Sequence, residues 1–248
     1  MKQAFLIPVY RHGATLRHVV DQLVPYNLPI IIVDDGNDEE NKAFIAQVVK
    51  EVPLCQVVTL STNSGKGKAV SAGIIAAHEQ NITHVLQIDA DGQHDTSRCS
   101  FFLEQSACHP EALICGYPEF DESVPSHRKK GRQFGNRWTQ IVAWNPDIKD
   151  SMCGFRVYPV EQLYHIICTT YLDSYMSFDT EILVRLSWKN VPMLFYPVKV
   201  VYPKNGTSNF HVVKDNIRLS WMFTRLCCGM LLRVPLLSYR ALKKRLQA

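Results

Sequence analysis

Short apolar runs alternate with helix-like segments over the first ninety residues of this 248-residue chain. The apolar runs cover residues 4–10, 29–33, 56–60 and 83–88. After the first run, apolar residues such as Leu16, Val20 and Leu23 recur at the spacing of a helix that buries one face. β-Branched strands separated by helices are typical of a parallel sheet covered on both faces. The sequence therefore predicts an α/β fold with a mostly parallel sheet flanked by helices.

Polar side chains stand directly after these runs. They are Tyr10, Asp35, Lys66, Asp89 and Asp91. Ligands of open parallel sheets bind at the carboxyl ends of the strands. We therefore expect one crevice to collect these five side chains.

The sequence Asp89-Ala90-Asp91-Gly92-Gln93 follows the fourth apolar run. Two carboxylates one residue apart offer the hard oxygen ligands that Mg²⁺ and Mn²⁺ prefer, and such ions keep water and phosphate oxygens as further ligands. A plain strand-to-turn transition is the alternative, because Asp and Gly are ordinary turn residues. A phosphatase that forms an aspartyl phosphate would carry this motif on its first strand, with a hydroxyl residue after the glycine. Here the motif follows the fourth run and Gln93 comes next.

Four motifs in fixed order carry a family resemblance. They are Ile-Pro-Val-Tyr at 7–10, Val-Asp-Asp-Gly at 33–36, Asn-x-Gly-Lys-Gly at 63–67 and Asp-Ala-Asp-Gly-Gln at 89–93. Together they are far more specific than any one alone. Over about residues 3–210 the chain resembles a family 2 glycosyltransferase of the GT-A fold, in the branch that makes dolichol- or polyprenyl-phosphate sugars.

The resemblance implies a nucleotide-diphosphate sugar as donor and Mg²⁺ or Mn²⁺ as cofactor. The implied donor-binding residues are Pro8, Tyr10, Asp35, Lys66 and Asp89, and the implied metal ligands are Asp89, Asp91 and Gln93. Each of these residues could instead have a purely structural role. Tyr10 would equally suit a half-buried core position. Lys66 opens a helix, where a cation is unfavourable unless an anion is nearby, and this favours a functional role.

Acceptor binding is expected from the second half of the chain. The run His127-Arg128-Lys129-Lys130-Gly131-Arg132 precedes an amphipathic segment at 134–144. Charge runs are usually solvated faces, but this one suits an anionic group near a membrane surface. Members of the polyprenyl-phosphate branch place a comparable basic segment near the lipid phosphate. We therefore assign Arg128, with Arg132 in reserve, to acceptor binding.

Three further residues are catalytic candidates. Asp150 and Arg156 belong to Asp-x-x-x-Gly-Phe-Arg, which resembles the next landmark of the family, and Asp179 lies at the start of a helix-like segment. At a helix start a carboxylate often serves only as a cap. A hydroxyl acceptor needs a general base, whereas a phosphate acceptor is already ionised. An essential base at Asp150 or Asp179 would therefore indicate a hydroxyl acceptor. Farther on, residues 198–202 resemble a last strand.

The C-terminal segment concentrates positive charge. Residues 212–248 contain eight Lys or Arg and one Asp, a net charge of +7, whereas the whole chain carries +4. Large apolar residues are interspersed, and no uncharged run reaches the roughly 18 residues of a spanning helix. We predict a glycosyltransferase domain at 1–211 and a basic amphipathic tail at 212–248 that lies on an anionic membrane surface. The alternatives are packing on the core or a homodimer through this helix. Nucleic-acid binding is not expected, because aromatic residues are not spread through a basic groove.

The predicted function is inverting, metal-dependent sugar transfer to a lipid-linked or membrane-proximal acceptor, either a polyprenyl phosphate or a glycolipid hydroxyl. A non-catalytic nucleotide-sugar-binding module is the alternative. A nucleotidyltransferase would need a fuller glycine- and arginine-rich loop than Arg11-His12-Gly13. Eight cysteines without Cys-x-x-Cys spacing favour a reducing compartment. Since strand-like sequence begins at residue 4, we expect no signal peptide and a cytoplasmic, peripheral location at the inner membrane face.

Overall fold

The computed structural model describes residues 1–119, 126–199 and 212–246, without the side chains of 126–128, 212–214 and 244–246. Its strands are β1 Gln3–Val9, β2 Ile30–Asp35, β3 Cys55–Leu60, β4 His84–Gln87, β5 Leu113–Glu119, β6 Arg156–Pro159 and β7 Met193–Lys199. Its helices are α1 Gly13–Leu23, α2 Glu39–Glu51, α3 Lys66–Glu79, α4 Cys99–Cys108, α5 Ser126–Ala143, α6 Val160–Thr169, α7 Phe178–Trp188, α8 Val212–Leu231 and α9 Val234–Leu246. The expected α/β class is confirmed.

The described residues form one seven-stranded sheet in the order β3-β2-β1-β4-β6-β5-β7. β1 to β4 are parallel, β6 runs antiparallel to both β4 and β5, and β7 is parallel to β5. The predicted parallel half is therefore correct. The antiparallel β6 was not predicted, and the last strand begins at Met193 rather than at residue 198.

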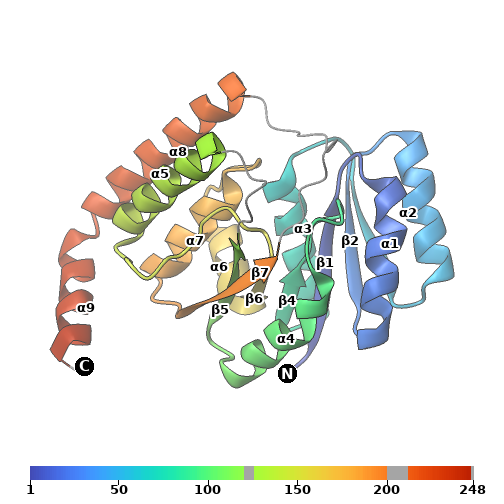
Figure 1. Cartoon of the computed structure of the whole chain (residues 1–248), viewed down its shortest axis with the longest axis horizontal. Helices are drawn as coiled ribbons and strands as arrows, with labels where there is room; N and C mark the ends of the chain where they lie inside the picture. The colour runs from blue at the N-terminus through green and yellow to red at the C-terminus, as the bar shows by residue number, and fades with distance from the viewer. Residues whose placement is uncertain (120–125, 200–211, 247–248) are drawn as a thin grey trace.

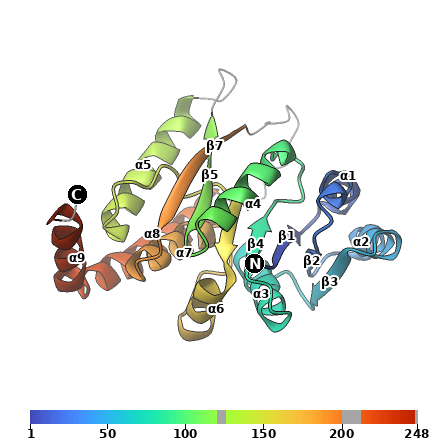
Figure 2. The same ribbon diagram turned by 90° about the horizontal axis from the view of Figure 1, so that it is seen from below.

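Both faces of the sheet are covered, which explains the uninterrupted apolar runs. Along β1, Leu6 packs in one core cluster with α3, α6 and α7, whereas Phe5 and Ile7 pack in the other with α1, α2 and α4. Successive residues of a strand face opposite sides, so a strand buried on both sides must be apolar throughout. Figures 1 and 2 show α1 and α2 beside the β1–β3 end of the sheet, with α5, α8 and α9 beyond its other end.

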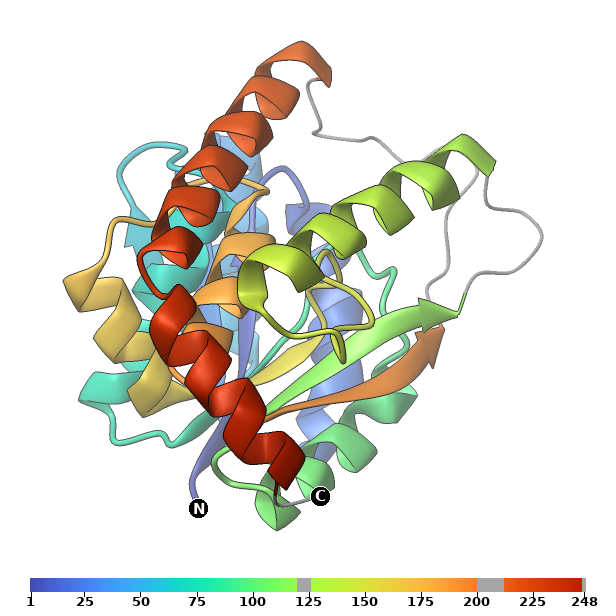
Figure 3. The ribbon, with the colours of Figure 1, turned by 90° about the vertical axis from the view of Figure 1, so that its left-hand side faces the viewer.

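The C-terminal helices pack partly on the rest of the protein. Met222, Leu226 and Leu237 are buried within the core cluster that also contains α7. Arg240 donates a hydrogen bond of 2.7 Å to the Trp188 carbonyl at the end of α7. Figure 3 shows α8 and α9 in red beside α5. No helix in the described parts of the chain is both long and apolar enough to cross a bilayer. The division at residue 211 stays a prediction.

Candidate functional site

Three charged side chains meet at the carboxyl edge of the sheet, and two of them, Lys66 and Asp89, belong to the set expected at the strand ends. Nζ of Lys66, the first residue of α3, lies 2.9 Å from Oδ1 of Asp89 and 3.1 Å from Oδ2 of Asp179. Asp89 follows β4, and Asp179 lies in the first turn of α7. Elements distant in the sequence therefore converge on one ammonium group.

The cluster is largely shielded from solvent. The side chains of Lys66 and Asp179 are 15% and 3% exposed, while that of Asp89 is 27% exposed. Burial alone would lower the pKa of Lys66, but Asp179 and Asp89 outweigh it and hold this pKa above its ordinary value. Burial alone would raise the pKa of Asp89, but Lys66 and His94 hold it below its ordinary value. Lys66 and Asp89 are therefore both charged at neutral pH. Oδ1 of Asp179 is buried and accepts no hydrogen bond from the described residues.

Gly154 forms the wall of this cluster. A Cβ atom there would lie 2.7 Å from Nζ of Lys66, 2.8 Å from Nε2 of Gln87 and 3.1 Å from Oδ2 of Asp89. Any side chain at 154 would therefore displace the polar ends of these residues. The glycine in the Asp-x-x-x-Gly-Phe-Arg landmark thus has a steric reason.

Asp35 holds the turn that precedes Lys66. Its two carboxylate oxygens accept hydrogen bonds from the backbone N–H groups of Ser64, at 2.8 Å, and Gly65, at 2.9 Å. Burial raises the pKa of Asp35, although these two hydrogen bonds oppose the shift. The structure therefore shows Asp35 bracing the turn, whereas the resemblance assigns it to the nucleobase.

Gly65 and Gly67 admit the close approach of the chain between α6 and α7. A Cβ on Gly67 would lie 2.5 Å from the Asp173 carbonyl oxygen, and Gly65 has a φ of +92°. The Ser174 carbonyl accepts the N–H of Gly67, at 2.9 Å. The sequence shows two glycines but cannot show what approaches them. Here the neighbour is the protein's own backbone.

Asp91 and His94 lie beside Asp89. Oδ1 of Asp91 accepts the Gln93 backbone N–H at 3.0 Å, and the Asp89 backbone N–H donates to Nδ1 of His94 at 3.3 Å. No three His, Cys, Asp or Glu side chains of the described residues come together as a metal site. Two carboxylates following one strand nevertheless fit Mg²⁺ or Mn²⁺, because these ions complete their shells with water and phosphate oxygens.

Pro8 and Tyr10 lie at the end of β1, where they were expected. Both are partly exposed, and the Arg11 guanidinium lies 5.1 Å from the centroid of the Tyr10 ring. Tyr10 therefore lies at the carboxyl edge of the sheet with a guanidinium over its ring.

Asp150 is saturated with hydrogen bonds. Arg132 donates to both of its oxygens, at 2.5 and 2.8 Å, and the backbone N–H groups of Met152 and Cys153 donate at 2.9 and 2.7 Å. Burial alone would raise the pKa of Asp150, but Arg132 outweighs it and holds this pKa below its ordinary value. A carboxylate held in this way is a weak base. The side chain of Arg128 lies outside the described residues.

Arg156 is fully buried. Its guanidinium donates to the carbonyl oxygens of Asp179, at 2.6 Å, and Ser151, at 2.8 Å. It thereby links the start of α7 to the chain that follows Asp150. This contact positions Asp179 through its backbone.

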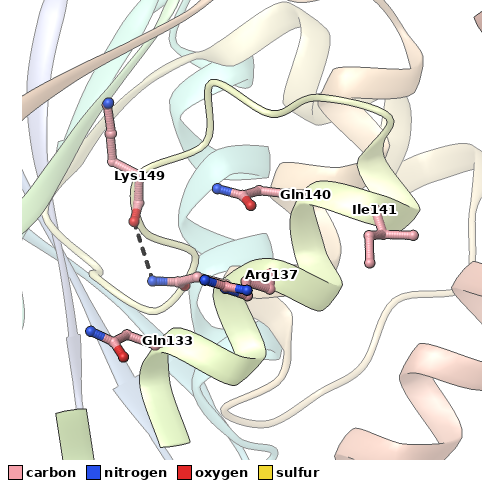
Figure 4. A pocket seen from close by; sticks show the side chains of 6 residues that line it. Gln133, Arg137, Gln140, Ile141 and Lys149 are labelled. Carbon is pink, nitrogen blue, oxygen red and sulfur yellow. Dashed lines mark hydrogen bonds between the residues drawn. The ribbon is translucent and has the colours of Figure 1, made fainter. Parts of the chain in front are cut away.

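Two adjoining cavities open along α5. The larger, of about 630 Å³, is lined by Gln133, Asn136, Arg137, Gln140, Ile141 and Lys149. The smaller, of about 170 Å³, adds Tyr117, Pro118, Lys129, Arg132 and Asp150. Figure 4 shows Gln133, Arg137 and Gln140 along α5, with Lys149 across the cavity. We call this surface the α5 groove. Four cations line it, and it starts at the carboxyl end of β5.

The sequence profile described as glycosyl transferase family 2 matches residues 4–172. The dolichyl-phosphate beta-glucosyltransferase of Dictyostelium discoideum is 23% identical over 244 residues, covering 88% of this chain and 73% of that protein. The mouse protein of the same name is 23% identical over 210 residues, covering 76% of this chain. This chain spans less than two thirds of that relative, at 64%.

Solved structures of low sequence identity share the fold. Glucosyl-3-phosphoglycerate synthase of Mycobacterium tuberculosis, in complex with Mn²⁺, UDP-glucose and phosphoglyceric acid, superposes with a TM-score of 0.62 at 12% identity, covering 93% of this chain and 78% of that one. A mannosyltransferase of Pyrobaculum calidifontis with GDP-mannose and Mn²⁺ has a TM-score of 0.57 at 13% identity, covering 83% and 58%.

Proposed function

The chain belongs to glycosyl transferase family 2, with the GT-A fold that the motifs predicted, and from this premise we propose that it transfers a sugar from a nucleotide diphosphate to a polyprenyl phosphate with inversion. The choice of acceptor rests on the hydrogen bonds and ion pairs that the two candidate bases, Asp150 and Asp179, already form within the protein. Asp150 is saturated by Arg132 and backbone donors, and Asp179 is paired with Lys66. Asp150 has no oxygen left to take a proton from a hydroxyl, and Asp179 has only Oδ1 left. A phosphate oxygen needs no base, so a phosphate acceptor fits this site better than a glycolipid hydroxyl.

Donor binding falls to the carboxyl edge of the sheet. We assign Asp89 and Asp91, with Gln93, to a Mg²⁺ or Mn²⁺ ion, which when bound neutralises charge on the diphosphate. Lys66 keeps Asp89 in place. Oδ1 of Asp179, buried and without a hydrogen bond from the described residues, suits a sugar hydroxyl.

Tyr10 and Pro8 border the nucleobase in this proposal. Tyr10 is partly exposed at the end of β1, with the Arg11 guanidinium over its ring. Asp35 acts there through the turn that it holds, at Ser64 and Gly65. We assign Asp150 and Arg156 to positioning, because the first orients Arg132 and the second fixes the backbone of Asp179.

Acceptor binding falls to the α5 groove. Its cations Lys129, Arg132 and Arg137 on α5 and Lys149 beyond it suit a phosphate head, and Arg128 precedes Lys129 on α5. An acceptor oxygen forms the new bond to the anomeric carbon, while the bond from that carbon to the diphosphate breaks and its electron pair leaves with the diphosphate. No proton moves. Attack opposite the leaving group inverts the anomeric centre.

Peripheral membrane contact follows from the same acceptor. Large apolar side chains are exposed on α5, α8, α9 and the turn between the last two, namely Phe134, Trp138, Ile141, Ile217, Trp221, Leu231, Leu232, Tyr239 and Leu242. Basic residues accompany them on these helices. Such a surface suits an anionic bilayer, which would place the enzyme at a cytoplasmic membrane face. A homodimer through α8 and α9 would bury the same residues.

The test is transfer of labelled glucose from UDP-glucose, with Mn²⁺, to dolichyl phosphate in detergent. UDP-glucose comes first because the relatives named above are glucosyltransferases, and GDP-mannose is the second donor. Phosphate-free dolichol is the matched control acceptor. We expect product with dolichyl phosphate, none with dolichol, and loss of turnover in Asp91→Asn. Transfer to a hydroxyl acceptor alone would contradict the proposal, and donor binding without any turnover would favour the non-catalytic module.

A further inference from the structure

The chain between α6 and α7, which we call the 171–177 segment, supports the turn that carries Lys66. The Ser174 carbonyl accepts the backbone N–H groups of Gly67, at 2.9 Å, and Lys68, at 3.3 Å. A Cβ on Gly65 would lie 2.4 Å from that same oxygen and 2.7 Å from Cδ1 of Tyr175. The turn is therefore built directly against this segment. The start of α3, and with it Lys66, depends on where the segment lies.

The C-terminal helix α8 contacts the same segment through two arginines. The Arg218 guanidinium carbon lies 3.5 Å from the centroid of the Tyr175 ring, and that of Arg225 lies 4.8 Å from the Tyr171 ring. Guanidinium groups at these distances from an aromatic ring are attracted to its face. Two consecutive stacks along α8 thus hold two tyrosines of one short segment.

A buried carboxylate reinforces this connection. Oε2 of Glu181, on α7, accepts the Asp173 backbone N–H at 2.8 Å and an N–H of Arg225 at 3.1 Å. Its Oε1 accepts Arg185 at 2.5 Å, and Glu181 has no exposed surface. The segment, α7 and α8 are therefore tied at one point.

We propose that α8 is a positioning element of the donor site. Arg218 and Arg225 hold the 171–177 segment, the segment fixes the 65–67 turn, and the turn places Lys66 against Asp89 and Asp179. The helix α8, proposed above to contact the membrane, thus also sets the geometry of the donor site. The inference rests on the proposed function only in naming the ligand a nucleotide sugar.

Hydrogen exchange in the ligand-free full chain tests the connection without any substrate. Arg218→Gln removes a stack on Tyr175 from a residue that does not touch the turn, and we expect about three- to tenfold faster exchange in the peptide spanning residues 64–70. Tyr175→Leu should act alike, while Tyr175→Phe, which keeps the ring, should exchange like wild type. The matched control is Arg233→Gln, whose guanidinium carbon lies 4.7 Å from the Trp188 ring, away from the segment.

Donor affinity gives the second readout. The dissociation constants of UDP-glucose and GDP-mannose are measured with Mn²⁺, and whichever binds wild type should bind Arg218→Gln and Tyr175→Leu at least threefold more weakly. Tyr175→Phe and Arg233→Gln should stay within twofold. If wild type binds neither nucleotide, the proposed function fails, and the exchange experiment still decides the inference. Exchange in Arg218→Gln and Tyr175→Leu equal to that of wild type would overturn it.

Discussion

At the scale of single residues, Gly154 separates the chemistry of the site from the stability of the fold. The three atoms nearest to a Cβ there are at the ends of the Lys66, Gln87 and Asp89 side chains. Such ends can shift at small cost in folding free energy, but their positions define the donor site. We therefore expect Gly154→Ala to lower kcat/KM at least a hundredfold with a free energy of unfolding within about 1 kcal/mol of wild type.

The matched control is Gly131→Ala on α5, where a Cβ would meet nothing within 4 Å. Alanine there should raise the free energy of unfolding by up to about 1 kcal/mol, because glycine is a poor helix former, and should leave kcat/KM unchanged. Activity assays and urea unfolding measure both quantities. Equal kcat/KM in the two variants would remove Gly154 from the site.

The ion pair of Asp150 and Arg132 gives stability a defined pH dependence. Because the folded-state pKa of Asp150 is lowered, its contribution is present above the unfolded value near 3.9 and is lost as the pH falls through the folded value. Arg132→Gln leaves the carboxylate buried and without its cation, so the variant should lose about 3 kcal/mol at pH 7. The difference from wild type should shrink steadily below about pH 4. Urea unfolding between pH 3.5 and 7 measures it, and a constant difference would contradict this account.

At the scale of elements, sequence patterns predicted those parts whose burial is periodic. The parallel strands β1, β2 and β4 could be recognised because their residues are buried on both faces, whereas in β3 buried or partly buried residues alternate with exposed ones. β6 was missed because it begins with Arg156, a charged residue whose guanidinium is buried and donates to the carbonyl oxygens of Asp179 and Ser151. A buried charged residue whose hydrogen-bond partners lie elsewhere in the fold interrupts the apolar pattern by which a buried strand is recognised in a sequence.

For the candidate site, the sequence indicated which side chains lie near one another, and their roles stay predictions. Asp89 and Lys66 were expected to lie close together because the carboxyl ends of parallel strands lie at the same edge of a sheet. Whether a carboxylate is free to bind a ligand depends on its hydrogen-bond partners. These partners are brought together by the tertiary fold and could not be predicted from the sequence. Arg132 on Asp150 and Ser64 on Asp35 are such contacts.

Glu181 shows how a buried carboxylate joins elements. It accepts hydrogen bonds from Arg185 within α7, from Arg225 on α8 and from the Asp173 backbone. Glu181→Gln removes the negative charge that pairs with Arg185 and Arg225. The substitution should lower the free energy of unfolding by about 3 kcal/mol. Urea unfolding measures the loss. Glu161→Gln, at a glutamate whose side chain is 62% exposed, should change it by less than about 0.5 kcal/mol, and equal losses would mean that the Glu181 network does not tie these elements.

At the scale of the whole molecule, charge and exposed apolar surface gather on the same helices. The residues from 212 onward carry a net charge of +7, although the whole chain carries +4. Figure 3 shows α5, α8 and α9 together on one side of the molecule. Their exposed residues include Ile217 and Trp221 on α8, at 65% and 62%. Since α8 also buries Met222 and Leu226, this helix has one face in the core and one exposed face.

The bilayer and the homodimer make opposite predictions for a variant of the outer face. If the face meets a membrane, Ile217→Ser with Trp221→Ser should weaken binding to phosphatidylserine-containing vesicles at least tenfold, because each apolar side chain contributes about 1.5–3 kcal/mol on burial. Wild-type binding should also weaken with salt, since the cations on these helices act through a screened attraction. Val57→Ser, at a 42% exposed valine on β3, is the control and should bind like wild type. Vesicle sedimentation measures membrane binding and light scattering measures the oligomeric state, so the two methods together distinguish the two cases. A wild-type dimer that becomes monomeric in the double variant, without a change in vesicle binding, would assign this face to a second copy of the chain.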